Sequence, residues 1–215
     1  HTNGFRKQAN TTTEILPMLT WRPNPWHQLT LDFDYRKIRV VPDPYGIQFR
    51  GGSILDVPRH TKYSTPFAHV DQEVFRGALH YEWRFSDNFM VRNNFTLLQR
   101  DLFLLRNSFG SVAAGSTAMT GRRLRRQTDD ARDYQYQLEP VWSVRTGSIK
   151  HELLLGFEYL NQFNAFKRVE ADLPNIDDVF HPVIRDTKQG LVFSRRAFDG
   201  HIQAQQFGLY AQDFI

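Results

Sequence analysis

Hydrophobic and polar residues alternate strictly over several stretches of the chain. Residues 29–35, 75–85, 134–144 and 153–159 carry large apolar side chains at nearly every second position. This period of two is that of a β-strand with one apolar face, and no segment of useful length has the spacing of an amphipathic helix. Weaker alternation at 15–21, 89–97 and 207–214 brings the set to seven predicted strands. The predicted fold class is therefore all-β and antiparallel.

Short and long connections alternate between these predicted strands. The short ones, at 22–27, 86–88 and 146–148, contain the Pro, Asn, Asp, Gly and Ser residues of hairpin turns. The long ones cover roughly 41–70, 107–132 and 170–206, and structureless loops of that length are uncommon in a compact soluble domain. Short turns at one rim and long loops at the other are typical of an outer-membrane β-barrel.

The aromatic residues support the same interpretation. All four tryptophans lie close to a short turn, namely Trp21, Trp26, Trp83 and Trp142. Indole rings favour the boundary between membrane and water, so these residues predict an interfacial girdle at one rim. A second girdle is expected from aromatic residues at the other strand ends, namely Tyr35, Phe75, Tyr134, Phe163 and Phe166.

If the apolar positions face lipid, the polar positions between them must line the interior. These positions include Asp32, Asp34, Arg36, Arg76, His80, Glu82, Arg84, Gln135, Gln137 and Glu139. A lining of this kind predicts a wet lumen or one filled by a polar plug. Alternation alone does not distinguish this lining from the solvated face of a soluble sheet. The long loops at one rim and the tryptophans at the other favour the barrel.

Composition excludes several classes of protein. An aromatic content of 14% is the opposite of the disorder signature. The mean hydropathy is −0.52, and the chain has no apolar run near the ~18 residues of a spanning helix, which excludes a helical membrane protein but leaves a barrel open. The net charge of +4 is spread along the chain, so no nucleic-acid partner is expected. The absence of cysteine excludes disulfide scaffolds, thiol catalysis and cysteine metal sites.

The sequence carries no pattern that is typical of an enzyme. The eight histidines show no HExxH spacing, and neither a phosphate-binding glycine loop nor a GxSxG elbow is present. Close pairs of polar residues such as Asp32 and Asp34 arise on any alternating polar face. We therefore expect no enzymatic activity and no catalytic residue.

Four phrases resemble TonB-dependent ferric siderophore receptors, most closely the ferrichrome and hydroxamate-type branch. They are LTWRP within 15–25, FSDNFMVRNNF at 85–95, GSIKHELLLGFEY at 147–159 and FGLYAQD at 207–213. The resemblance implies a barrel of about 22 strands closed by a plug domain, which imports an iron chelate with energy from the TonB complex. Residues 1–215 would then form a partial β-barrel domain, with the plug domain absent and about seven strands of the wall present.

The resemblance also suggests ligand-binding residues. Tyr45 lies just after the second predicted strand, where relatives place aromatic residues that contact the chelate, and Phe49 is a less certain companion. The second predicted loop carries four arginines within five residues, namely Arg122, Arg123, Arg125 and Arg126. Their charge would steer an anionic chelate into the mouth; alternatively they contact lipopolysaccharide or are merely solvated. The iron arrives chelated, so no cofactor and no protein metal ligand are expected.

The expected partners are a ferric siderophore, the TonB complex acting through the missing plug region, and outer-membrane lipid with lipopolysaccharide. The expected location is the outer membrane of a Gram-negative bacterium. Two other classes stay open at this point. A general porin would share the alternation and the girdle, and a soluble antiparallel β-protein that binds carbohydrate or protein would share the alternation only.

Overall fold

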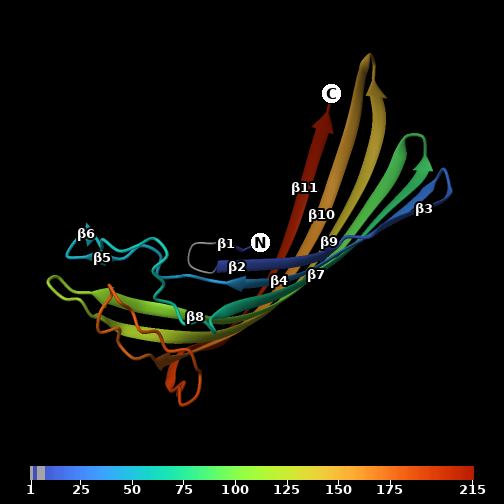
Figure 1. Ribbon diagram of the computed structural model, residues 1–215. Coiled ribbons are helices and arrows are strands. Elements are labelled where there is room, and N and C mark those ends of the chain that lie inside the picture. The colour runs from blue at the N-terminus through green and yellow to red at the C-terminus, as the bar shows by residue number, and fades with distance from the viewer. Residues whose placement is uncertain (1, 4–7) are drawn as a thin grey trace.

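The seven predicted strands are all present, in the predicted order, in one sheet whose long strands pair antiparallel (Figure 1). The structure is a computed structural model that describes residues 2–3 and 8–215, without the side chains of Thr2, Asn3 and Arg196. The strands are β1 (Thr2–Asn3), β2 (Gln8–Ile15), β3 (Met18–Asn24), β4 (His27–Val41), β5 (Phe49–Arg50), β6 (Ser53–Ile54), β7 (His69–Ser86), β8 (Phe89–Val112), β9 (Met119–Thr146), β10 (Ile149–Asp172) and β11 (Arg195–Phe214). The described residues contain no helix with the length and apolarity that a membrane span requires.

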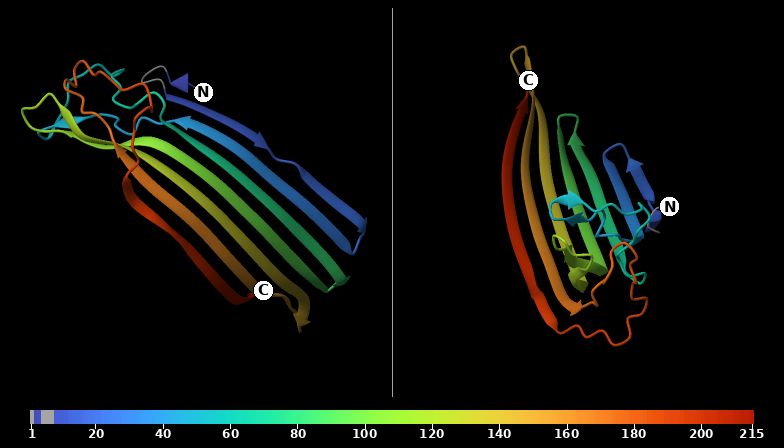
Figure 2. Two further views of the ribbon diagram at one scale, coloured as in Figure 1. Left: turned by 90° about the horizontal axis from the view of Figure 1, so that it is seen from below. Right: turned by 60° about the vertical axis from the view of Figure 1, so that its left-hand side comes forward.

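The sheet follows the order of the sequence. Its path runs from β2 through β4, β7, β8, β9 and β10 to β11, so each long strand pairs with its neighbours along the chain. β2 and β3 both pair with β4 and form one edge, interrupted at Pro17. Proline has no backbone N–H to give to a ladder, but the Pro17 carbonyl still accepts a 3.0 Å hydrogen bond from the Phe33 amide. Figure 2 shows the strands side by side, with short turns at one end and long loops at the other.

The strands are much longer than the alternation predicts. β8, β9 and β10 contain 24, 28 and 24 residues, whereas about 9–11 tilted residues cross the hydrocarbon core of a bilayer. The prediction of a long loop over 107–132 is wrong, because β8 and β9 continue through it and leave only residues 113–118 as a connection. Polar side chains fill both faces of the sheet in much of this region, so the hydrophobic pattern does not reveal the strands.

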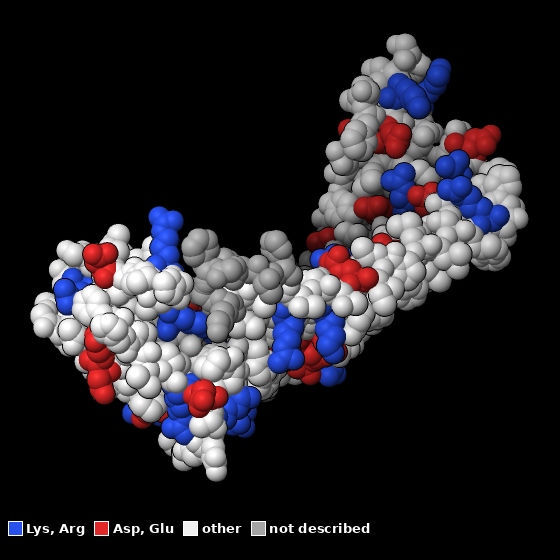
Figure 3. All heavy atoms as spheres, viewed as in Figure 1, with Lys and Arg blue, Asp and Glu red and all other residues white. Residues whose placement is uncertain are grey.

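The two faces of the sheet differ as the alternation predicts. The apolar face is marked by a row of register partners across five strands, namely Leu79, Phe95, Tyr136, Tyr159 and Phe207. The opposite, polar face carries the residues predicted to line an interior. In Figure 3 the lower right surface, near the short turns, shows few charged side chains, while charges of both signs gather around the loop end.

The tryptophan girdle is a continuous row of rings beside the short turns. His27 lies 5.5 Å from Trp83, which stacks on Phe85 at 3.8 Å. The row continues from Phe85 to Phe89 at 5.2 Å and from Phe89 to Trp142 at 4.7 Å. Residues from four strands thus meet in one band, as expected for a rim of interfacial aromatic residues.

The second predicted girdle is correct in part. Tyr35 and Phe75 are register partners on the apolar face, and Phe163 lies on the same face. Phe166 is three residues beyond Phe163, and side chains at odd separations on a strand point to opposite faces. The assignment of Phe166 to the girdle is therefore wrong, because its ring lies on the polar face and stacks on Phe198 at 4.1 Å.

The buried core lies among the loops, at the end of the sheet away from the short turns. One cluster joins Tyr45, Leu55 and Tyr63 of the β4–β7 connection to Val112, Met119, Ile176 and Val179. A second joins Leu105 and Leu124 of the sheet to Leu173, with Phe67, Phe103, Leu191 and Phe193 against them. Met119 and Ile176 also exchange backbone hydrogen bonds of 2.8 and 3.0 Å. Loops 42–68 and 173–194 therefore pack on the apolar-face side of the extended strands.

Candidate functional site

The four predicted loop arginines belong to strand β9, and alternation sends them to both sides of the sheet. Arg123 and Arg125 share the polar face, while Arg122 and Arg126 lie on the apolar-face side with Leu124, which is fully buried. Their placement in a loop is therefore wrong. A single exposed cluster of four guanidinium groups does not form.

Arg122 and Tyr45 lie inside the loop core. Arg122 is 2% exposed, and its guanidinium donates hydrogen bonds to the Pro174 carbonyl at 2.7 Å and the Tyr63 carbonyl at 2.8 Å. The same guanidinium lies 5.9 Å from the centre of the Tyr45 ring. Tyr45 is 7% exposed, and its burial raises the pKa of its phenol. Both residues hold the loops together, and a ligand reaches them only if the loops open.

Phe49 and Arg126 lie apart from this pair. Phe49 is exposed in β5, outside the loop core. Arg126 is exposed, and its guanidinium lies 4.4 Å from the centre of the Phe193 ring. The six residues selected from the sequence thus occupy three different environments, and their role in ligand binding stays a prediction.

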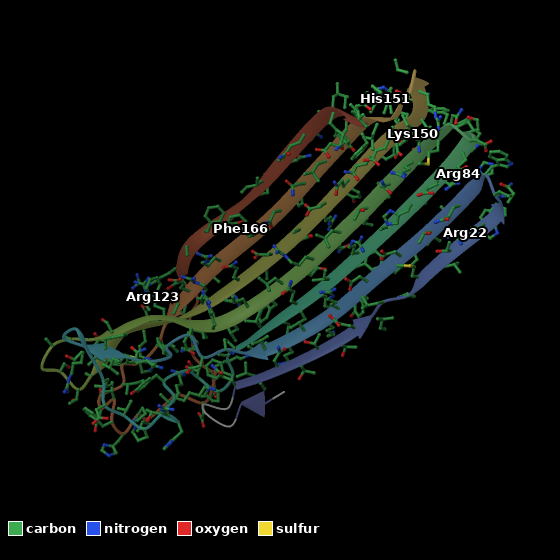
Figure 4. The ribbon with its side chains drawn as sticks, turned by 90° about the horizontal axis from the view of Figure 1, so that it is seen from above. Arg22, Arg84, Arg123, Lys150, His151 and Phe166 are labelled. Carbon is green, nitrogen blue, oxygen red and sulfur yellow. The ribbon has the colours of Figure 1, made fainter. Side chains whose placement is uncertain are left out.

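Arg123 and Arg125 form a compact group on the polar face around a buried carboxylate. The Glu170 side chain is 4% exposed and accepts hydrogen bonds of 3.1 Å from Arg123 and 3.1 Å from Arg125. Both guanidinium groups also lie over the exposed ring of Phe109, at 4.7 and 5.7 Å from its centre. Arg123 is labelled in Figure 4 at the loop end of the sheet. Asp172 also lies 3.8 Å from Arg123 and pairs with Arg195 at 3.1 Å, so three arginines share two carboxylates and the group keeps a net positive charge.

Glu170 and Phe109 have no signal in the sequence that marks them as members of this group. Glu170 is 45 residues from Arg125 in the chain, and only the register of β9 with β10 brings the two opposite each other. Phe109 adopts a φ of 59°, which is rare for a residue other than glycine. The hydrophobic pattern of the sequence does not reveal the register of the extended strands, and this register is what assembles the group.

Several of the predicted interior residues nearer the short turns make hydrogen bonds to side chains on neighbouring or next-neighbouring strands. Arg76 donates to Asp32 at 3.0 Å, His80 and Asn94 lie 2.7 Å apart, and the Tyr210 hydroxyl donates to Glu139 at 2.6 Å. This part of the polar face is a network of hydrogen bonds and ion pairs. Within the described residues, no three His, Asp or Glu side chains are grouped to hold a metal ion.

The fold matches known receptor barrels. The sheet superposes on the ferric-catecholate import receptor Fiu of E. coli in its open form with a TM-score of 0.77 at 18% identity. It superposes on the ferripyoverdine receptor of the outer membrane of Pseudomonas aeruginosa with a TM-score of 0.80 at 14% identity. The siderophore receptor PiuA of Acinetobacter baumannii gives a TM-score of 0.72 at 16% identity.

These matches cover 97–99% of this chain but only 28–35% of the matched chains. The chain therefore spans about a third of the length of these receptors, as an open antiparallel sheet. The sequence itself matches no family model and no curated protein. At these identities the likeness establishes the fold, and the activity has to be argued from the residues.

Proposed function

We propose that this chain is part of an outer-membrane receptor that imports a ferric siderophore with energy from the TonB complex. The observation that carries the proposal is the match of nearly the whole sheet to receptor barrels that are named for ferric siderophores. The two-faced sheet and the row of rings beside the short turns support it, because a lipid-facing barrel wall needs both. A soluble sheet has no need of strands of 24 to 28 residues with loops at one end.

Residues 1–215 would supply about a third of the barrel wall as a partial barrel domain. A plug domain and the contact with the TonB complex would come from other parts of the protein. The similarity is to transport barrels, so we propose import without any bond-making step, with no catalytic residue and no resident metal. The iron would enter as cargo, already held by its chelator.

Outer-membrane lipid and lipopolysaccharide are the proposed partners of the apolar face. Above its aromatic band, basic residues pair with carboxylates on the neighbouring strand: Lys37 with Glu73, Arg39 with Asp71 at 3.5 Å, and Lys167 with Asp199 at 3.7 Å. Charged groups of both signs at this height suit a layer of lipid head groups. The proposed location is therefore the outer membrane of a Gram-negative cell.

The candidates for ligand contact differ in how exposed they are. Phe49 is exposed and Arg123 is about one-third exposed, so both can meet a ligand without rearrangement, whereas Tyr45 and Arg122 cannot. Arg125 and Arg126 complete the proposed set. The assignment to the hydroxamate-type branch rests on the four sequence phrases alone, since the matched structures include receptors named for a catecholate and for pyoverdine.

Iron uptake by cells tests this function. A strain that lacks the full-length gene is compared with the same strain carrying it, with radiolabelled iron supplied as ferric siderophores of several classes. We expect uptake of at least one siderophore to require the gene and to stop when a protonophore dissipates the energy supply. Uptake that is identical in both strains for every siderophore, or that persists without energy, would contradict the proposal.

A further inference from the structure

A second group of arginines lies on the polar face of the extended strands. We define the arginine patch as Arg106 of β8 and Arg168 of β10, whose charges act on each other, with Arg100 six residues nearer the short turns on the same face of β8. None of the three forms an ion pair within the described part of the chain, in contrast to Arg123 and Arg125, which share Glu170. All three are partly buried, so their charges are only partly screened by water.

Arginines outnumber carboxylates around the patch, where Asp129 and Asp133 of β9 lie on the same face as the three arginines and Arg125. Arg106 lies directly opposite Arg125 in the register of β8 with β9, and like charges in such a pair repel. Arg168 donates through Nε to the neutral amide oxygen of Gln127 at 2.7 Å. Burial lowers the pKa of Arg106, and the charges of Arg125 and Arg168 lower it further.

Two donor atoms of the patch have no partner. The Nε atoms of Arg100 and Arg106 are shielded from solvent, and neither has a hydrogen-bond acceptor within reach. A donor in this position costs free energy until an acceptor arrives. The neighbouring carboxylate, Asp129, accepts from the Gln127 amide at 3.1 Å instead. The patch therefore combines positive charges with hydrogen-bond donors that have no acceptor, and both favour an anionic ligand.

A flat aromatic surface adjoins the patch. Phe198 of β11 lies directly opposite Arg168, and its ring stacks on Phe166 at 4.1 Å with only 4° between the planes. A side chain at Gly200 would meet the Phe198 ring at 3.2 Å, so the glycine leaves room for it. Phe198 is 43% exposed. Figure 4 shows Phe166 on β10, beside the edge strand β11.

The loops leave this side of the sheet uncovered. Loops 42–68 and 173–194 pack against Leu105, Leu124 and Phe103, which lie on the apolar-face side. Residues of the arginine patch point the other way, because alternation separates Arg106 from Leu105. In a barrel whose apolar face meets lipid, the patch and the two rings face the interior.

We propose that the arginine patch, together with Phe166 and Phe198, forms a wall subsite for an anionic ferric chelate that carries planar aryl groups. This inference rests on the proposed function and names the class of chelate, which differs from the hydroxamate class that the four sequence phrases suggest. Iron bound by catecholate groups forms a trianionic complex with flat rings at its surface, whereas the trihydroxamate complex of iron is neutral and lacks them. Guanidinium groups give charge-assisted hydrogen bonds to such oxygens, and the exposed Phe198 ring offers an aromatic contact.

The test is equilibrium binding to the full-length protein in detergent micelles, followed by quenching of tryptophan fluorescence. The probes are a trianionic ferric tris-catecholate and a neutral ferric trihydroxamate. We expect the double variant Arg106→Gln and Arg168→Gln to bind the tris-catecholate about tenfold or more weakly, and to bind the trihydroxamate as the parent protein does. The matched control is Lys167→Gln, which removes a charge from the residue beside Arg168 but on the opposite face, and should change neither affinity.

A further variant separates the ring from the charge. Phe198→Ala should weaken binding of the tris-catecholate severalfold and leave binding of ferric citrate, an anion without rings, unchanged. Raising the salt concentration should weaken the tris-catecholate more in the parent than in the double variant.

The outcomes separate the two proposals. Binding of some ferric chelate with no preference for the anion, or an unchanged tris-catecholate affinity in the double variant, overturns the subsite while the receptor function stands. An equal loss of affinity for both complexes also overturns the subsite. The arginines would then support the fold and would not discriminate between ligands by their charge. If the protein binds neither complex nor any other ferric chelate, the proposed function fails.

Discussion

The ring of Tyr210 in β11 lies over Gly156 in β10, its direct register partner on the polar face. A Cβ atom at Gly156 would collide with the atoms of that ring. With the ring in this place, the Tyr210 hydroxyl donates a 2.6 Å hydrogen bond to Glu139 of β9. One missing side chain therefore lets a tyrosine bridge three strands.

Gly156→Ala should displace the Tyr210 ring and remove the hydrogen bond to Glu139. We expect a loss of about 1–3 kcal/mol in the free energy of unfolding, from crowding and the broken hydrogen bond. Urea unfolding of the full-length protein, followed by electrophoretic mobility, measures it. The control is Gly77→Ala, where an added Cβ meets only ordinary contacts at 3.7–3.8 Å. Equal unfolding midpoints for the two variants would contradict the packing.

Glu170→Ala should loosen the loop end of β9 and β10. It leaves Arg123 and Arg125 without their shared carboxylate, and removing one partner of a buried ion pair costs about 3–5 kcal/mol. Hydrogen exchange of the β9 and β10 amides measures the effect, which should be confined to the loop end. Asp172→Asn is the control, because the Asp172 side chain is 64% exposed and pairs of this kind contribute little. Unchanged exchange in Glu170→Ala would mean that Glu170 does not hold the strands.

Arg122→Gln should release loops 42–68 and 173–194 from each other. The guanidinium joins the Tyr63 carbonyl of one loop to the Pro174 carbonyl of the other, and hydrogen bonds from charged groups contribute about 1.5–3 kcal/mol each. Limited proteolysis should cut the 173–194 loop faster than in the parent. Arg145→Gln, which removes an exposed arginine of the same strand beside the short turn, away from the loops, should leave the rate unchanged. Equal rates for both variants would show that Arg122 does not anchor the loops.

The β10–β11 loop should respond to acid through Asp178. Hydrogen bonds from His181 and from the Phe180 amide lower the pKa of this carboxyl below its usual value of about 3.9. A lowered pKa means that the contact is fully present above the usual value and is lost as the pH falls through the lowered one. Carbon NMR of the labelled carboxyl should give a midpoint below that of a free Asp, and His181→Ala should raise it. A midpoint at the usual value in the parent would refute the contact.

The sequence predicts the faces of the sheet well and the loop end poorly. Period-two alternation locates the strands around Phe95 and Tyr136, because one face of these strands is apolar and the other is not. The alternation is missing at the loop end of β9, around Arg123. Charged residues occupy both faces there, so the sequence of the strand resembles that of a loop. Phe166 is predicted on the wrong face because the alternation of its strand stops at Tyr159, before this residue.

The other features that the sequence does not predict arise from contacts between segments that are distant in the chain. Tyr45 and Arg122 meet across 77 residues (122 minus 45). Their burial also involves Met119, at the start of β9, and Ile176 of the β10–β11 loop. No local pattern encodes such a cluster. The same holds for the arginine patch, since Arg106 and Arg168 are brought to one surface only by the register of β8, β9 and β10.

The proposed barrel wall requires the apolar face of the sheet to meet lipid. Phe95 and Thr96 are neighbours on β8, and alternation places them on the apolar and polar faces. The most direct measurement puts a spin label at Phe95→Cys or at Thr96→Cys in the full-length protein, in lipid bilayers, and compares collisions with oxygen and with a water-soluble nickel complex. We predict that the label at 95 meets oxygen dissolved in lipid and the label at 96 meets the nickel complex. Equal access of the nickel complex to both positions would contradict a barrel wall.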